Sequence, residues 1–102
     1  MIRPEDLLHP TPAGLYCPPG DFYIDPVRPV DRAVITHGHA DHARAGHGAV
    51  LATRQTLAIM AERYGADFTL QPQSVEYGEA TAINGVDLRL ACLLYTSDAA
   101  DE

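Results

Sequence analysis

One short segment of this 102-residue chain carries most of its chemical information: Thr36-His37-Gly38-His39-Ala40-Asp41-His42. It places three histidines and one aspartate within six positions. The segment begins at the end of the apolar run Ala33-Val34-Ile35-Thr36, and a short apolar run of this kind is typical of a buried strand. The sequence therefore predicts that a strand inside the protein ends in a loop rich in potential metal ligands.

The spacing of these side chains favours metal binding. In an extended chain, residues i and i+2 project to the same side, so His37 and His39 can direct two imidazoles at one ion. Asp41 and His42 are adjacent and point differently, which suits a second ion. Imidazole and carboxylate together favour zinc, manganese or iron over calcium or magnesium. The competing interpretations are a solvated polar turn, and a zincin, whose H-E-x-x-H motif the sequence lacks.

Patterns outside this segment predict a mixed α/β fold with an antiparallel component. Thr53 is a good N-cap and Gly65 a typical helix end, so we expect a helix between them. Asn84-Gly85 is a strong signal for a two-residue hairpin turn, here between strands at 81–83 and 86–90. Residues 1–13 contain three prolines and are expected to be irregular. Further strands are expected at 15–17, 21–25, 33–36, 49–52 and 68–70.

The composition limits the classes of function. Fourteen acidic residues face seven basic ones, all of them arginine, for a formal net charge of −7. Binding of nucleic acid through phosphate contacts alone is therefore disfavoured, although bound metal ions could supply positive charge. No run reaches the roughly 18 apolar residues of a membrane span, and the N-terminus lacks the apolar core of a signal peptide. We expect a cytoplasmic protein that does not associate with a membrane.

The pattern His37-x-His39-x-Asp41-His42 resembles the H-x-H-x-D-H signature of the metallo-β-lactamase superfamily. The resemblance implies an α/β fold of the αββα-sandwich type. It also implies that His37 and His39 bind a first metal ion, and that Asp41 and His42 bind a second.

Asp25 resembles the aspartate of the superfamily's first motif, because it follows the strand-like run Phe22-Tyr23-Ile24. The role implied for Asp25 is to accept a hydrogen bond that fixes the orientation of a metal ligand. The alternative is a simple turn residue at the end of a strand, before Pro26.

The flanking residues more specifically resemble the ligase-associated DNA exonucleases, which are relatives of the RNA 3′-end-processing nucleases. The similarity spans roughly residues 3–91 and includes Leu15-Tyr16-Cys17-Pro18 and the run from Gly20 to Pro26. It implies a phosphodiester hydrolase with two zinc ions, or manganese or iron instead, in which a metal-bridging hydroxide attacks phosphorus. Asp41 would be catalytic, orienting that hydroxide. DNA is the implied substrate, with RNA as the alternative, and a DNA ligase and a helicase are the implied partners.

We expect two parts along the chain. Residues 1–91 are expected to be the truncated N-terminal portion of a metallo-β-lactamase-like domain. Residues 92–102 resemble the translation of a transposon-derived sequencing adapter and are expected to be an artefact. After His42 the chain contains one further histidine, His47, which is too close to act as a downstream ligand. Because zinc sites use at least three protein ligands, the fragment itself is expected to be inactive.

Other functions remain open for the same H-x-H-x-D-H core. A thioester or lactone hydrolase would use it, as would an RNA-processing nuclease. A non-catalytic metallo-β-lactamase-like subunit would bind nucleic acid or a partner without cutting. His9 and His47 lack partner spacing and are expected to be non-ligands, and Cys17 is expected to be a packing residue.

Overall fold

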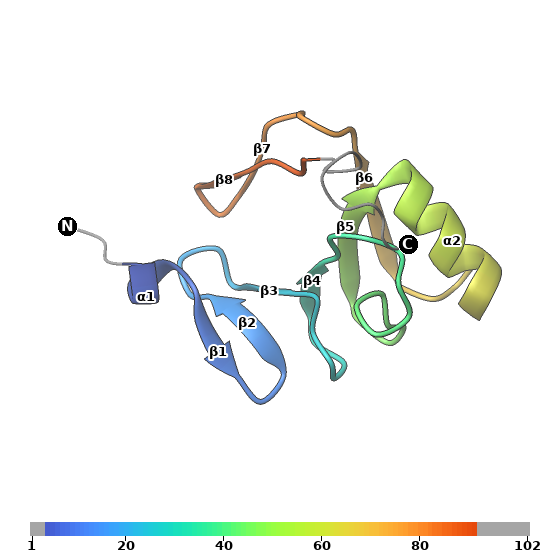
Figure 1. The fold of residues 1–102 in the computed structure, drawn as a ribbon, viewed down its shortest axis with the longest axis horizontal. Helices are drawn as coiled ribbons and strands as arrows, with labels where there is room; N and C mark the ends of the chain where they lie inside the picture. Colours follow the sequence, from blue (N-terminus) through green and yellow to red (C-terminus); the bar gives the residue numbers. More distant parts are fainter. Residues whose placement is uncertain (1–3, 92–102) are drawn as a thin grey trace.

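Six strands form one mixed sheet, in which the spatial order follows the order along the chain (Figure 1). A computed structural model describes residues 4–91. The strands of this sheet are β1 (His9–Thr11), β2 (Gly14–Cys17), β3 (Phe22–Ile24), β4 (Arg32–Val34), β5 (Ala49–Thr53) and β6 (Gln71–Val75). Strands β1 to β3 pair antiparallel, and strands β3 to β6 pair parallel. The predicted mixed α/β fold with an antiparallel component is thus confirmed at this coarse level.

Helix α2 (Arg54–Tyr64) begins and ends where its capping residues predict. The Thr53 hydroxyl accepts a hydrogen bond from the Thr56 amide at 3.3 Å, which satisfies one of the free N–H groups of the first turn. Gly65 ends the helix with φ of 102°, a conformation that favours glycine. Met60 is fully buried and fixes the helix on the sheet.

The predicted hairpin is also present, as a separate pair of antiparallel strands, β7 (Thr81–Ile83) and β8 (Val86–Leu88). Asn84 and Gly85 have φ of 50° and 85°. Both central residues therefore have positive φ, as a type I′ turn requires.

Two expectations about local structure were wrong. Phe68-Thr69-Leu70 is not a strand: Phe68 and Thr69 are buried in a bend, and the strand starts only at Gln71. The first 13 residues are not wholly irregular, since they include a short helix, α1 (Pro4–Leu7), and strand β1. Both β1 and β6 contain a proline, which is tolerated because each lies at an edge of the sheet.

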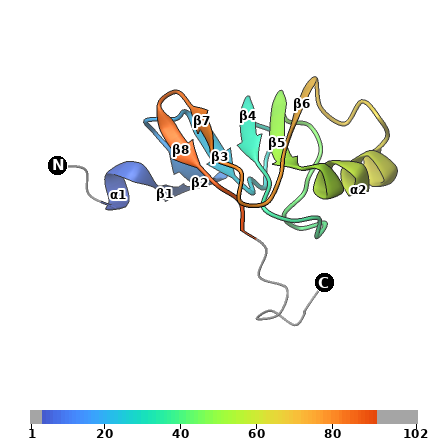
Figure 2. The ribbon, with the colours of Figure 1, turned by 90° about the horizontal axis from the view of Figure 1, so that it is seen from above.

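Side chains of the central strands alternate between two apolar clusters on opposite faces of the sheet. Ala33 and Val50 belong to the cluster that contains Met60 of α2. Val34 and Leu51 belong to the other cluster, against which the hairpin packs. In both overall views the hairpin lies toward β1–β3, whereas α2 lies beside β5 and β6 (Figures 1 and 2). The packing of α2 and the hairpin on the two faces holds in place the end of the sheet at which β3 and β4 finish.

Among residues 4–91, no helix is long and apolar enough to cross a membrane. The expected adapter-derived segment, residues 92–102, lies outside the part of the chain that the structure describes.

Candidate metal centre

The histidine-rich segment and Asp25 meet at one edge of the sheet because β3 and β4 are parallel neighbours. Asp25 directly follows β3, and Ile35 and Thr36 follow β4. The Asp25 amide donates to the Val34 carbonyl at 2.9 Å, which ties the two strand ends together. Asp25 has φ of 47°, in the left-handed region that aspartate tolerates better than most residues.

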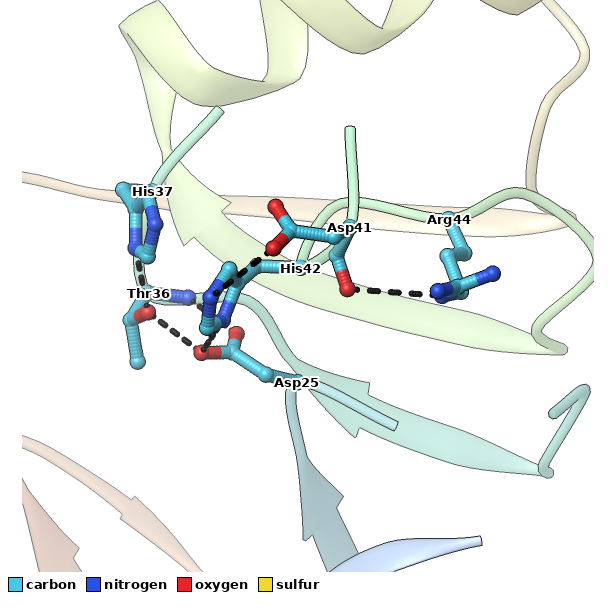
Figure 3. A network of polar contacts seen from close by, with 6 residues as sticks. All are labelled: Asp25, Thr36, His37, Asp41, His42 and Arg44. Atoms are coloured by element: carbon cyan, nitrogen blue, oxygen red, sulfur yellow. Dashed lines mark hydrogen bonds and ion pairs between the residues drawn. The ribbon is translucent and has the colours of Figure 1, made fainter. Parts of the chain in front are cut away.

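The Asp25 carboxylate is the hub of the polar contacts (Figure 3). Its Oδ1 accepts from the Thr36 amide at 2.8 Å, and its Oδ2 accepts from the Thr36 hydroxyl at 2.5 Å. The same Oδ2 lies 3.0 Å from Nδ1 of His42. One carboxylate thus contacts both the residue that precedes the first histidine and the last histidine of the segment.

A tight turn returns the chain toward Asp25. The amides of His42 and Ala43 both donate to the His39 carbonyl, at 2.9 and 2.8 Å. Ala43 is fully buried in the core, and its carbonyl accepts from the Tyr64 hydroxyl at 2.9 Å. Helix α2 therefore anchors the turn that positions His42.

Asp25, His37 and His42 form a group that could hold a metal ion. One ligand atom from each residue lies within 4.8 Å of the others. The ring centroids of His37 and His42 are 4.2 Å apart. Two imidazoles and a carboxylate are a donor set that suits zinc, which binds nitrogen and oxygen at about 2.0–2.2 Å. Asp25, His37 and His42 could therefore hold a metal ion, although this set is not the one expected from the sequence.

The two remaining residues of the signature lie next to this group without belonging to it. The His39 ring centroid is 4.9 Å from that of His37, in an edge-on arrangement. Asp41 Oδ2 lies 3.8 Å from His42 Nε2, and its side chain is 72% exposed. The contacts thus bring His37 together with His42 and Asp25. The expected division of His37, His39, Asp41 and His42 between two metal ions stays a prediction.

The surroundings of His37 favour its neutral form, the form that binds metal. Burial is the main reason that the pKa of His37 is lowered, and the neighbouring His42 imidazole acts in the same direction. The Asp25 carboxylate acts in the opposite direction but does not reverse the shift.

His47 and Cys17 lie in the interior, away from the metal-binding group. His47 is 2% exposed, and its Nδ1 accepts from the Val30 amide at 3.2 Å. Cys17 is 1% exposed and packs in the cluster on the hairpin side of the sheet. The expectation that Cys17 is a packing residue is confirmed.

A hollow of about 450 Å³ adjoins the metal-binding group. Asp25, Asp41, His42 and Arg44 form its polar side. Its apolar side includes Leu15 and Val27, which are 43% and 49% exposed. The hollow is open and combines polar and apolar walls next to the metal-binding group.

One residue of the site was missed by reasoning from the sequence. Thr36 was assigned only to the strand, yet its hydroxyl lies between Asp25 and His37. Its position directly before the first histidine was the available signal.

No protein-family model, curated protein or solved structure matches the chain.

Proposed function

We propose that residues 1–91 are the N-terminal portion of a metallo-β-lactamase-like, metal-dependent phosphodiester hydrolase, of the ligase-associated DNA exonuclease type. The observation that carries the proposal is the convergence of Asp25, His37 and His42 within 4.8 Å at the end of two parallel strands. Two histidines of the H-x-H-x-D-H signature thus lie together with the neighbouring Asp25, in a group that could hold a metal ion, and this supports the proposal. The αββα sandwich itself is part of this proposal.

The residues of the site have distinct roles in the proposed reaction. Two bound divalent ions, which we propose to be zinc, would supply Lewis acidity and a water of lowered pKa. His37 and His39 would hold the first ion, and Asp41 and His42 the second. Asp41, whose carboxylate is largely exposed, also orients the attacking water by accepting its hydrogen bond. Asp25 positions the histidines through its contacts with His42 and Thr36.

The hollow beside the metal-binding group supports a phosphodiester substrate over a neutral thioester or lactone. Arg44 lines it next to Asp41, and the Arg44 Nε donates to the Asp41 carbonyl at 3.4 Å (Figure 3). A guanidinium that lines the same hollow as the metal-binding group can pair with a phosphate oxygen. The apolar wall at Leu15 and Val27 would contact the sugar or base of the same strand.

The test is metal-dependent cleavage by the protein encoded by the complete gene, since the proposal assigns further ligands to a later part of the domain. We expect cleavage of DNA after zinc or manganese addition and loss of cleavage in the double variant His37→Ala, His39→Ala. His9→Ala is the matched control, because His9 lies in β1 outside the metal-binding group. Full activity of the double variant would refute the metal mechanism.

The same assay decides between substrates. Single-stranded DNA, double-stranded DNA, RNA and a thioester are compared under one set of conditions. Preferential cleavage of RNA would make the protein an RNA-processing nuclease, and thioester hydrolysis alone would refute the phosphodiesterase. Metal binding without any hydrolysis would favour a non-catalytic subunit.

We further propose a cytoplasmic location and association with a DNA ligase and a helicase, which rest on the resemblance alone. Co-purification from the native cell with a tagged copy tests this association. Recovery of neither enzyme would contradict it.

A further inference from the structure

The hydroxyl of Thr36 occupies a specific place in the site, between a carboxylate and an imidazole. It lies 2.5 Å from Asp25 Oδ2 and 2.8 Å from His37 Nδ1. The Thr36 amide donates to the other carboxylate oxygen at 2.8 Å, so the backbone and the side chain of Thr36 both donate hydrogen bonds to Asp25. The position of the hydroxyl relative to Asp25 is thereby fixed.

The number of hydrogens available to these three side chains allows only one arrangement of the hydrogen bonds between them. A threonine hydroxyl has a single hydrogen, and an ionised carboxylate can only accept. The contact between Thr36 Oγ1 and Asp25 Oδ2 has the length of a charge-assisted O–H···O⁻ bond, about 2.5–2.7 Å. The Thr36 hydrogen therefore goes to Asp25, and only a lone pair faces His37. His37 Nδ1 must then carry the hydrogen.

We infer that Thr36 is a positioning residue that sets the tautomer of His37, so that Nδ1 is protonated and Nε2 presents its lone pair to the metal. The inference rests on the proposed metal site. Thr36 acts without touching metal or substrate, as a relay from Asp25. Asp25 also contacts Nδ1 of His42 directly, so the same carboxylate would leave Nε2 of both histidines available to metal.

The same geometry bears on the role of Asp25. Its Oδ2 already accepts from Thr36 and faces His42, while Oδ1 accepts from the Thr36 amide. These contacts occupy three of the roughly four acceptor sites of the carboxylate. The relay therefore assigns Asp25 to orientation of the histidines.

The first test is the tautomer of His37 in the metal-free chain, read from the ¹⁵N resonances of its ring. Measurement at about pH 8 keeps histidines of ordinary pKa neutral. We expect a pyrrole-type signal for Nδ1 and a pyridine-type signal for Nε2. A proton on Nε2 in the wild-type chain would overturn the inference, and this readout requires neither a variant nor bound metal.

The second test compares zinc affinity in Thr36→Val, Thr36→Ser and the matched control Thr81→Val, which lies in β7. Loss of a group that orients a metal ligand weakens metal binding by about 10–100-fold. We expect a loss in that range for Thr36→Val, rescue by Thr36→Ser, and wild-type affinity for Thr81→Val. Wild-type affinity and an unchanged tautomer in Thr36→Val would contradict the role of Thr36. Failure of the wild-type chain to bind zinc would instead contradict a metal site formed by this chain's own residues, while the tautomer measurement would still decide the relay.

Discussion

At the scale of single residues, Asp25 determines the geometry of the site. Its carboxylate accepts from the amide and the hydroxyl of Thr36 and contacts His42, while its own backbone has positive φ. A residue that makes this many contacts from an uncommon conformation is held there by its surroundings. Asp25 lies in the turn after β3, and from there its carboxylate contacts Thr36 and His42; its role in orienting a metal ligand stays a prediction.

Replacing Asp25 should weaken metal binding without abolishing the ligands. In Asp25→Ala both histidines lose the group that orients them, and we expect zinc affinity to fall by about 10–100-fold. Calorimetric titration of the purified chain measures this. Asp87→Ala, on the exposed side of β8, should retain wild-type affinity. Equal affinities of the two variants would show that Asp25 does not serve the site.

Arg44 should contribute to binding of the nucleic-acid backbone. In Arg44→Gln we expect affinity of the zinc-loaded chain for a single-stranded oligonucleotide to fall about tenfold, equivalent to a charge-assisted hydrogen bond of roughly 1.5 kcal/mol. Fluorescence anisotropy measures the affinity. Arg63→Gln is the control, since Arg63 lies in the last turn of α2. An equal loss in both variants would reveal only a general effect of charge.

At the scale of secondary-structure elements, the predictable parts were those with strong local signals. Thr53 and Gly65 delimit α2, and Asn84-Gly85 makes the hairpin turn, because the conformation of each is set by its own side chain or lack of one. Strand β6 lacked such a signal: its sequence, Gln-Pro-Gln-Ser-Val, is mostly polar and contains a proline. Its extended form is imposed by pairing with β5, which a local pattern does not report.

The candidate site likewise has a part that local sequence signals predict and a part that they do not. The ligand-rich segment was evident because its residues are contiguous, and its place after a strand was predicted from the preceding apolar run. The contact of His42 with Asp25 and the relay through Thr36 depend on which strands are neighbours. Parallel pairing of β3 with β4 creates that proximity, and no residue spacing reveals it.

The N-cap of α2 provides a test at this scale. Thr53→Ala removes the oxygen that accepts from the Thr56 amide, and we expect the free energy of unfolding to fall by about 1 kcal/mol. Thr53→Ser keeps the oxygen and should lose less. Urea denaturation of the two variants measures the difference. If both lost the same free energy, the methyl group of Thr53, rather than its hydroxyl, would be what matters.

At the scale of the whole molecule, the core holds the C-terminal side of the loop that carries the histidines. Ala43 packs in the core and is bonded to Tyr64 of α2, and His47 is buried beside Val30. Nε2 of His47 is buried without a hydrogen-bond partner in the part of the chain that the structure describes. Protonation of His47 inside the protein would therefore be costly.

His47 should make stability depend on pH. Burial lowers the pKa of His47 below its ordinary value of 6.5. Between the lowered pKa and 6.5 the unfolded chain binds more protons than the native one, so the free energy of unfolding falls as the pH falls through this window. His47→Asn keeps an acceptor for the Val30 amide but does not titrate, and its stability should fall less steeply. Denaturation between about pH 8 and pH 5 measures both slopes. If the free energy of unfolding of the two proteins fell equally steeply with pH, His47 would be excluded as a source of the pH dependence.

The most direct test of the metal centre is calorimetric titration of zinc into the chain itself. We expect at least one zinc ion to bind per chain, to raise the temperature of unfolding because it binds the native state, and to bind at least about tenfold more weakly in His37→Ala and in His42→Ala. His9→Ala should behave as the wild type. Absence of zinc binding by the wild-type chain, or undiminished binding by the His37 and His42 variants, would contradict a metal centre built on these two histidines.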